Sequence, residues 1–396
     1  MNQRKVAFEI IYKTISDKAY TNLLMREKLK ELEPIQRPFV TNLVIGVLKE
    51  YDYLFFQFRD FLKNSTSLRN KIIIAMALYE RYYLSSDAYY VNNEYVELAN
   101  KHDKPFVNAI LRKEYEFKKG PEHINESLPE WIYKLLKSQY EEDEFKRILK
   151  NYKRIPTVYY RLNHNKCKYA DLKDINIINE DIFTSNKSLV NCEEFKKGYF
   201  YIEDINSSSL VKHLDLKKGD VLLDVCCAPG SKLFNCLDIV NPKNAYSNEI
   251  HEHRLELIKE RAKLLGFDGV HYLNYDGRIL SDVLDVKFDK ILLDVPCSGL
   301  GTLGRKPDLK YHLSPSSLDE LQIIQKGLLN STSKLLKTNG EILYSTCTLN
   351  KKENGKQVAA FLKEHDEFIL KEEDTIINDL GDCFYYAVLK KEDKWV

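Results

Sequence analysis

The sequence predicts a protein of three parts, an all-helical N-terminal domain, a small α/β connector and a C-terminal α/β domain. First, 396 residues are enough for two or three domains. Second, apolar residues recur at helical spacing through the N-terminal third, without alternating strand patterns. Third, strand-like and helix-like segments alternate from residue 203 onward, which is typical of a parallel sheet with helices on both faces. The predicted ranges are 1–124, 125–202 and 203–396.

The N-terminal helices are predicted from apolar spacing, and the connector from a change of pattern. Helical spacing is seen at Val6, Ile10, Ile11 and Ile15, and again at Val40, Leu43, Val44 and Leu48. The turn-forming residues 119–121 (Lys-Gly-Pro) mark a boundary. Two helical stretches, 129–140 and 144–152, then precede short β-branched runs such as 158–162.

The C-terminal domain is expected to contain five strands separated by helices, and then a hairpin. The predicted strands are 221–225, 245–250, 270–273, 290–295 and 341–345. Apolar residues spaced for helices lie at 255–265 and 318–328. The last two strand patterns, 367–370 and 384–389, have little between them, and this predicts an antiparallel pair at the sheet edge.

Composition excludes several classes of protein. The longest apolar runs fall short of a membrane span, and the N-terminus carries no apolar signal core, so a cytoplasmic protein is expected. Eight cysteines without C-x-x-C spacing predict neither a metal site nor disulfides. The net charge is +1, but residues 1–124 hold 20 Lys and Arg against 16 Asp and Glu. This excess weakly favours a phosphate-bearing partner.

The segment after the first predicted C-terminal strand has the position of a cofactor loop. In parallel α/β sheets, ligands bind beyond the carboxyl ends of the strands. A glycine there lets backbone approach a ligand, and a lysine at the helix start can meet a carboxylate. The signature G-x-G-x-x-G is absent, which disfavours a nicotinamide cofactor. The candidate residues are Cys226, Cys227, Ala228, Pro229, Gly230, Ser231 and Lys232.

Two acidic residues follow the next strands in order. Glu249 ends the second strand, where a carboxylate can accept from both hydroxyls of a ribose. Asp276 ends the third and could accept from an adenine amino group. Either alone is more often a helix cap or turn residue, but together, in strand order, they make S-adenosylmethionine the leading cofactor.

Two cysteines follow the fourth and fifth strands and indicate the chemistry. Cys297 lies in D-V-P-C-S-G-L-G after Asp294, and Cys347 lies in Y-S-T-C-T. These strands are expected to be neighbours, so the thiols should lie close together. The C5 atom of cytosine becomes nucleophilic only when a thiolate adds at C6, and a second group must help to resolve the adduct. Two thiols beside a cofactor loop therefore favour methylation of a carbon.

With these motifs the chain resembles bacterial ribosomal RNA cytosine-C5 methyltransferases of the RsmB type, in the Sun/NOL/NOP family. The N-terminal part resembles a NusB-like RNA-binding domain, and the C-terminal part a Rossmann-like class I S-adenosylmethionine-dependent methyltransferase. The N-terminal motifs are A-Y-T-N-L-L (19–24), L-V-I-G-V-L-K (43–49), V-N-N-E-Y-V-E-L-A (91–99) and P-F-V-N-A-I-L-R (105–112). The others are P-x-x-x-x-R-L-N (156–163), C-C-A-P-G-S-K, D-V-P-C-S-G-L-G, R-K-P-D-L-K-Y (305–311), Y-S-T-C-T, K-E-N (352–354) and F-Y-Y-A-V-L-K (384–390).

The resemblance implies a role for each matched residue. Cys347 would be the nucleophile and Cys297 would assist release. Asp294 would contact the cofactor, with the 226–232 loop, Glu249 and Asp276, and would also hydrogen-bond the cytosine ring edge. Ribosomal RNA of the small subunit (16S), naked or in an early assembly intermediate, would be the partner of a monomeric enzyme. Phosphate contacts are expected from Arg305, Lys306 and Lys310.

The sequence also departs from the family pattern, and rival functions stay open. Cys227, Ser231 and Leu233 replace an alanine, a glycine and a threonine, and Glu203 stands where a glutamine is usual. A DNA cytosine-C5 methyltransferase is disfavoured because Glu353-Asn354 is followed by glycine and no E-N-V occurs. A transfer RNA methyltransferase and a non-catalytic RNA-binding assembly factor remain as alternatives, although a pure binding protein has no use for the two thiols.

Overall fold

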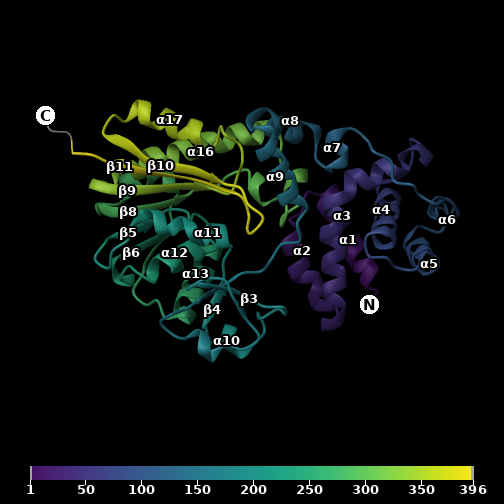
Figure 1. The fold of residues 1–396 in the computed structure, drawn as a ribbon, viewed down its shortest axis with the longest axis horizontal. Coiled ribbons are helices and arrows are strands. Elements are labelled where there is room, and N and C mark those ends of the chain that lie inside the picture. Colours follow the sequence, from purple (N-terminus) through teal and green to yellow (C-terminus); the bar gives the residue numbers. More distant parts are fainter. Residues whose placement is uncertain (1, 394–396) are drawn as a thin grey trace. The chain divides into compact units, whose positions relative to one another are not determined.

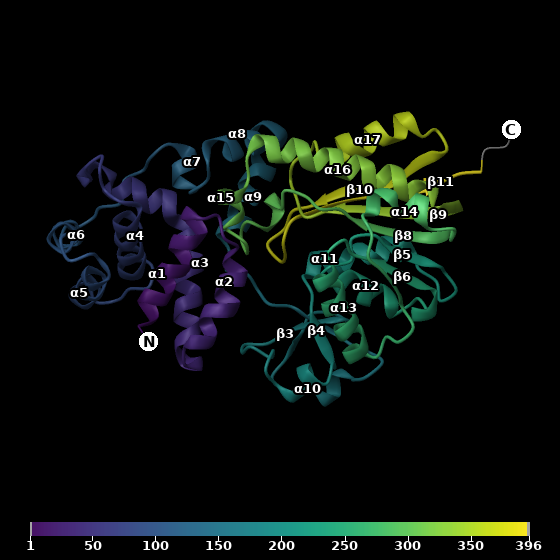
Figure 2. The ribbon, with the colours of Figure 1, turned by 180° about the vertical axis from the view of Figure 1, so that it is seen from behind.

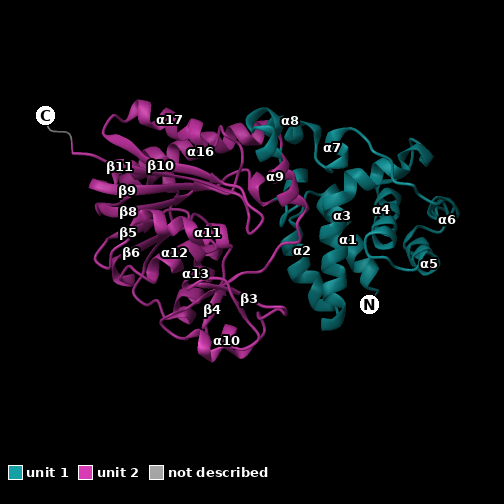
Figure 3. Cartoon of the chain, in the orientation of Figure 1, with its two compact units in different colours: residues 1–145, 303–313 teal, residues 146–302, 314–396 magenta. Residues whose placement is uncertain are grey.

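The computed structural model describes residues 2–393, which divide into two compact units (Figure 3). The first unit comprises residues 1–145 and 303–313, and the second comprises residues 146–302 and 314–396. The predicted boundaries at 124 and 202 therefore do not coincide with the boundary between these units. No helix among residues 2–393 is both long and apolar enough to cross a membrane.

The first unit is helical, as predicted for the N-terminal part. Its core is built from the apolar faces of α1, α3 and α4, and includes Ile11, Leu43, Val47 and Ile74. Side-chain caps begin several helices, for example Ser67 before α4. The helices are α1 (Gln3–Ser16), α2 (Thr21–Lys28), α3 (Arg37–Phe58), α4 (Leu68–Tyr82), α5 (Ala88–Leu98), α6 (Lys104–Leu111), α7 (Glu122–Asn125), α8 (Glu130–Gln139) and the late α15 (Leu309–His312). The helix α9 (Glu142–Lys153) spans the boundary between the units.

The second unit is built around a seven-stranded sheet with the order β10-β11-β9-β8-β5-β6-β7. The five strands from β9 to β7 are parallel, and β10 and β11 run antiparallel at one edge, which confirms the predicted hairpin. The strands are β5 (Leu222–Asp224), β6 (Ala245–Asn248), β7 (His271–Leu273), β8 (Phe288–Asp294), β9 (Leu336–Thr346), β10 (Phe368–Ile376) and β11 (Phe384–Lys391).

Helices cover both faces of this sheet (Figures 1 and 2). Alternate residues along each strand point to opposite faces. Ile291 and Tyr344 pack with Leu328 of α16 and Phe361 of α17, whereas the neighbouring Leu292 packs toward α11 and α12 on the other face. The helices are α11 (Ile205–Leu210), α12 (Ser231–Leu237), α13 (Glu252–Leu265), α14 (Leu280–Val283), α16 (Pro315–Lys334) and α17 (Gly355–Glu364).

The predicted connector contains a four-stranded antiparallel sheet within the second unit. Its order is β2-β3-β1-β4. Rings of Tyr160, Phe183 and Phe200 pack together in its core. The elements are β1 (Tyr160–Leu162), β2 (Asn176–Ile177), β3 (Ile182–Thr184), α10 (Glu193–Lys196) and β4 (Phe200–Ile202).

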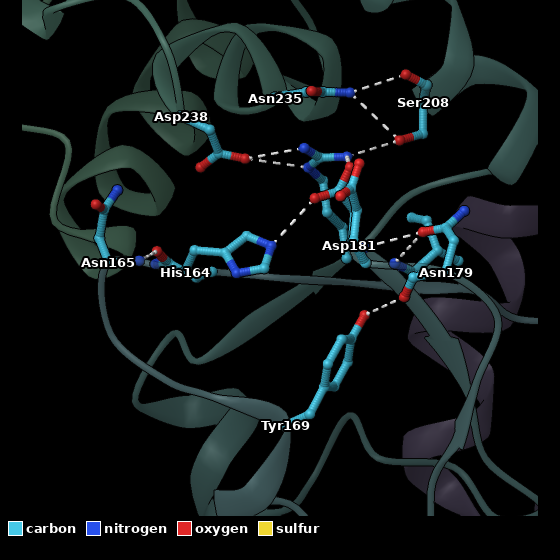
Figure 4. Close-up of polar contacts among 12 residues, drawn as sticks. His164, Asn165, Tyr169, Asn179, Asp181, Ser208, Asn235 and Asp238 are labelled. Carbon is cyan, nitrogen blue, oxygen red and sulfur yellow. Dashed lines mark hydrogen bonds and ion pairs between the residues drawn. The ribbon is translucent and has the colours of Figure 1, made fainter.

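A buried arginine joins the connector sheet to the helices that cover the seven-stranded sheet. The Arg161 guanidinium lies 3.1 Å from a carboxylate oxygen of Asp238 and 3.3 Å from one of Asp181. It also donates to the Ser208 hydroxyl at 2.9 Å. The contacts of Asp238 and Ser208 are drawn as dashed lines in Figure 4. Glu203 lies 4.0 Å from the guanidinium. One cation thus lies among three acidic side chains, and this fixes β1 against the end of α12.

Candidate active site

The loop between β5 and α12 has the conformation of a close-approach turn. Gly230 has a φ of 102°, in the left-handed region that favours glycine. A Cβ atom there would lie 2.8 Å from the ring of Phe234, so a side chain would also press against that ring. Of the predicted loop residues, Cys227 is buried, Pro229 is exposed, and Cys226, Ala228 and Ser231 are intermediate.

Hydrogen bonds from β6 hold this loop in place. The backbone N–H of Cys227 donates to the Asn248 carbonyl at 3.0 Å. The Asn248 side-chain amide donates to the carbonyls of Val225 and Tyr275, and its oxygen accepts from the Tyr275 N–H. The loops after β5, β6 and β7 are therefore joined at the carboxyl edge of the sheet.

Glu249 lies at that edge with its carboxylate constrained. It is 4% exposed, and one oxygen accepts from the backbone N–H of His251 at 3.0 Å. The other oxygen lies 3.5 Å from the guanidinium of Arg254, which also donates to the Ala228 carbonyl. This arrangement orients the carboxylate beside the loop, as a ligand for two hydroxyls requires.

Asp276 follows β7 and is engaged locally. Its carboxylate accepts from the backbone and the guanidinium of Arg278, and the hydrogen bonds from Arg278 hold its pKa below the usual range. Part of the side chain remains accessible. The residue is therefore both a cap of the following turn and an ionised acceptor at the expected strand end.

A further acidic residue, Asp224, was not among the predicted cofactor contacts. It ends β5, and neither of its carboxylate oxygens has a hydrogen-bond partner among residues 2–393. Burial, followed by the nearby Asp294, raises the pKa of Asp224 well above its usual range. An unpaired buried carboxylate is costly, so this position fits a ligand that brings positive charge. The only sequence signal of Asp224 was its place at a strand end.

The Lys232 ammonium lies 2.8 Å from a carboxylate oxygen of Asp294. It is therefore paired and not free at the start of α12. Its side chain is 11% exposed, and its ammonium lies 5.0 Å from the centre of the Phe384 ring. Burial opposes the charge, but Asp294 outweighs this effect and the pKa of Lys232 is raised. The second oxygen of Asp294 accepts from the Ser345 hydroxyl at 2.8 Å. The loop lysine is thus tied to β8 and β9, and Ser345 is a site residue that the sequence analysis missed.

The two predicted thiols lie together. The Sγ atoms of Cys297 and Cys347 are 3.3 Å apart, because their strands β8 and β9 are parallel neighbours in register from Lys290 to Asp294. This confirms the predicted proximity. The hydrogen bond with Cys347, followed by burial, raises the pKa of Cys297 well above its usual range. Among residues 2–393, no group of His, Cys, Asp or Glu is arranged to hold a metal ion.

The three basic residues expected to contact RNA differ in their surroundings. Arg305 and Lys306 are exposed, but Lys310 is buried in the first unit, with its side chain 2% exposed. Its ammonium donates to the Ser127 carbonyl at 2.6 Å and to Asp52 at 3.1 Å. An ammonium committed to these acceptors cannot also contact a phosphate. The structure therefore gives Lys310 a structural role in place of the predicted RNA contact.

Comparison with known proteins agrees with this division of the chain. A family model described as "16S rRNA methyltransferase RsmB/F" matches residues 211–387, and the NusB family model matches residues 1–116. The chain is similar to a probable ribosomal RNA small subunit methyltransferase B of Bacillus subtilis, with 30% identity over 92% of this chain and 89% of the relative. The Yersinia pestis ribosomal RNA small subunit methyltransferase B is 26% identical, with 99% of each chain covered.

Solved structures share the fold. The crystal structure of PH0851 has a TM-score of 0.79 at 19% identity and covers 99% of both chains. NSun6 from Pyrococcus horikoshii has a TM-score of 0.61 at 19% identity, and covers 68% of this chain and all of that one. The predicted Rossmann-like methyltransferase fold and NusB-like domain are thereby confirmed. With a relative 30% identical over nearly its whole length, this chain belongs to the RsmB/F family of 16S ribosomal RNA methyltransferases.

Proposed function

We propose that this small-subunit ribosomal RNA methyltransferase modifies C5 of a cytidine through a covalent bond between Cys347 and C6. The observation that carries the proposal is the pair of thiols 3.3 Å apart at the ends of β8 and β9, beside Asp294. Methyl transfer to a nucleophilic nitrogen or oxygen needs no thiol. Methyl transfer to C5 needs one to activate the ring and gains from a second to resolve the adduct.

S-adenosylmethionine is the cofactor, and when bound it supplies an electrophilic methyl group. The residues that would hold it are the 226–232 loop, Glu249 and Asp276, with Asp224 added on the evidence of its unpaired buried carboxylate. Asp294 would lie between cofactor and substrate, since it contacts both the loop lysine and β9. Together these residues orient the reacting carbon toward the thiol pair.

The proposed reaction begins when the Cys347 thiolate forms a bond to C6, which places electron density on C5. The thiolate is the attacking species, and the Lys232 ammonium, which interacts electrostatically with Cys347, favours it. Asp294 hydrogen-bonds the ring edge and supports the charge that develops there. After methylation, a base removes the C5 proton, the C5–C6 double bond reforms and the Sγ–C6 bond breaks.

Cys297 is proposed to act after the methyl group has been transferred. Its raised pKa keeps it as a protonated thiol near neutral pH, so it does not compete for C6. From 3.3 Å it can donate a hydrogen bond to the departing Cys347 sulfur. This division of labour makes Cys347 the nucleophile and Cys297 the group that assists release.

The substrate RNA is proposed to be gripped outside the reacting pocket by the NusB-like helical domain and by the exposed Arg305 and Lys306. Contacts of this kind reach phosphates and recognise RNA shape, and they do not depend on base identity. The target cytidine would be turned out of its surroundings into the pocket. The relatives are named for ribosomal RNA of the small subunit and the matching family model for 16S rRNA, which favours 16S RNA as the substrate.

The direct test of this function is bisulfite sequencing of total RNA from cells with and without the gene. Bisulfite converts cytidine but not 5-methylcytidine, so the proposal predicts one protected 16S position that is lost in the deletion. Restoring the parent gene should restore protection, whereas a gene encoding Cys347→Ala should not. Protection that persists in the deletion, or a loss confined to transfer RNA, would contradict the proposed substrate.

A further inference from the structure

A buried carboxylate lies directly behind the two cysteine-bearing turns. Glu353 is 0% exposed and accepts four hydrogen bonds. One oxygen accepts from the Ser298 N–H at 2.9 Å and the Gln325 amide at 3.0 Å. The other accepts from the Ser298 hydroxyl at 2.6 Å and the Asn350 amide at 3.0 Å. Burying a carboxylate is unfavourable unless such bonds compensate, so its place behind the thiols calls for a function.

The partners of Glu353 reach both turns. Ser298 directly follows Cys297, and its hydroxyl also lies 2.7 Å from the hydroxyl of Thr348, which directly follows Cys347. The carboxylate and these two hydroxyls form one connected chain of hydrogen bonds across the pair of turns. Any shift of one turn relative to the other would break it.

Further bonds fix the same assembly to the helices and strands around it. Gln325 of α16 donates to the Pro296 carbonyl at 3.0 Å as well as to Glu353. The neighbouring Asn354 accepts from the Thr346 hydroxyl at 2.6 Å and donates to the Thr348 carbonyl at 2.9 Å. Residues on both sides of each cysteine are therefore held by one short segment.

We propose that Glu353 is a positioning residue that holds the Cys297 and Cys347 turns in the mutual register needed for attack and release. This proposal rests on the proposed function, because register matters only if both thiols act on the same bond, the one between the Cys347 sulfur and C6. Glu353 touches neither substrate nor cofactor in this account and acts through Ser298 and Thr348. Its negative charge also contributes, after Cys347 and burial, to the raised pKa of Cys297, which suits a thiol that must stay protonated.

The test measures register directly, in the full-length reduced protein. Diamide, an azo oxidant, takes two hydrogens from two thiols and becomes a hydrazine while one disulfide forms. The rate of the Cys297–Cys347 disulfide, followed by peptide mass spectrometry, reports how often the sulfurs meet. Glu353→Ala is expected to slow this rate and kcat by about tenfold or more, while affinity for S-adenosylmethionine stays within about twofold. Glu353→Gln, which keeps the shape and part of the bonding, should recover much of the rate.

A matched control separates register from stability. Glu341 is also a buried carboxylate, but it lies in the middle of β9 and is paired with Lys290 and Lys371. Glu341→Gln should lower the melting temperature without changing the disulfide rate. If Glu353→Ala does not fold, Ser298→Ala decides the question, because it removes only the hydroxyl between Glu353 and Thr348.

Two results would overturn the proposal. One is a folded Glu353→Ala, or failing that Ser298→Ala, with the disulfide rate and kcat of the parent. The other is an equal slowing in Glu341→Gln, which would show that general loosening is being measured. If the parent made no 5-methylcytidine, the proposed function would fail by itself, while the disulfide rates would still report whether Glu353 sets the register.

Discussion

Asp294 connects the cofactor loop with the thiol pair, because its two carboxylate oxygens are held from opposite sides. Lys232 of α12 donates to one oxygen and Ser345 of β9 to the other, both at 2.8 Å. A carboxylate fixed in this way needs little reorganisation when a ring edge binds, and preorganised groups of this kind are the main source of electrostatic catalysis.

Glu249 provides the sharpest residue-scale test of cofactor binding. Its buried carboxylate is oriented by His251 and Arg254 beside the loop. If it accepts from both ribose hydroxyls, Glu249→Ala should lose roughly 1.5–3 kcal/mol, which is about ten- to a hundredfold in Kd for S-adenosylmethionine. Calorimetric titration measures this loss. The exposed Glu252→Ala is the control, and a Glu249→Ala protein that is folded and binds like the parent would refute the assignment.

Glu203 carries a prediction for the pH dependence of stability. Burial raises the pKa of Glu203 to about 8. The charge of Asp238 also raises this pKa, whereas the charges of Arg161 and Lys232 lower it. The unfolded chain releases this proton near its ordinary pKa of about 4.3, and the folded protein retains it to about 8. Between these values the folded state binds more protons, so stability falls as pH rises, by up to about 1.4 kcal/mol per pH unit.

The variant Glu203→Gln isolates that contribution. The amide has nearly the same shape and cannot ionise, so urea unfolding between pH 5 and pH 8 should show a shallower loss of stability than in the parent. Its advantage should grow with pH and be smallest near pH 5. Parallel curves for the two proteins would mean that Glu203 is ionised in the folded state throughout the range.

At the scale of elements, the sequence predicted the parallel strands well, because buried strands are short apolar runs. The strand β5 was expected at 221–225 and is Leu222–Asp224. The strands β9 and β10 are longer than predicted. In β9 the first residues include Asn339 and Gly340, which have no apolar pattern, and β10 continues through a charged stretch to Ile376. Charged side chains are tolerated there because β10 is an edge strand.

The candidate site was predictable to the extent that it lies at strand ends. The loop, the acidic residues and the thiols all follow strands, so parallel topology brings them together. Glu353, Ser298 and Lys310 could not be placed in this way. Their roles depend on which carbonyls and hydroxyls surround them after folding, and a charged residue in a sequence is more often exposed than buried.

Lys310 leads to a prediction about the segment 303–313. Its ammonium satisfies Asp52 and the carbonyls of Lys49 and Ser127 in the first unit. Removing one partner of such a buried arrangement leaves the others unpaired, so Lys310→Ala should destabilise the first unit by about 3 kcal/mol or more. Chemical unfolding of the variant and the parent measures this difference in stability.

The exposed neighbour Lys306 is the matched control. Lys306→Ala should leave stability unchanged within about 0.5 kcal/mol, and weaken RNA binding with a smaller dependence on salt. If Lys310→Ala weakened RNA binding while stability stayed that of the parent, Lys310 would be a phosphate contact after all and its buried placement would be contradicted.

At the scale of the whole molecule, the two-unit division changes how the chain should be cut. A fragment of residues 203–396 contains every proposed cofactor residue, but it lacks Arg161, the cation beside Asp238 and Glu203. A fragment of residues 146–396 retains it. We expect this longer fragment to bind S-adenosylmethionine within about threefold of the full chain, and to have a kcat/KM on 16S RNA lower by at least about tenfold.

That comparison tests whether the helical domain anchors the RNA. Equal kcat/KM for the fragment and the full chain on the same transcript would show that it does not. If the fragment lost binding of S-adenosylmethionine as well as activity, residues 303–313 would need the rest of the first unit to keep the site intact. These residues belong to the first unit and not to the second.

In the proposed mechanism the two thiols act in order, Cys347 to form the bond with C6 and Cys297 to help break it. The most direct measurement is denaturing gel electrophoresis of the two cysteine variants after incubation with 16S RNA and S-adenosylmethionine. Cys297→Ala should accumulate a protein–RNA adduct that survives denaturation, and Cys347→Ala should form none and have no turnover. An adduct with Cys347→Ala and none with Cys297→Ala would exchange the two roles, and adducts with neither would contradict the covalent mechanism.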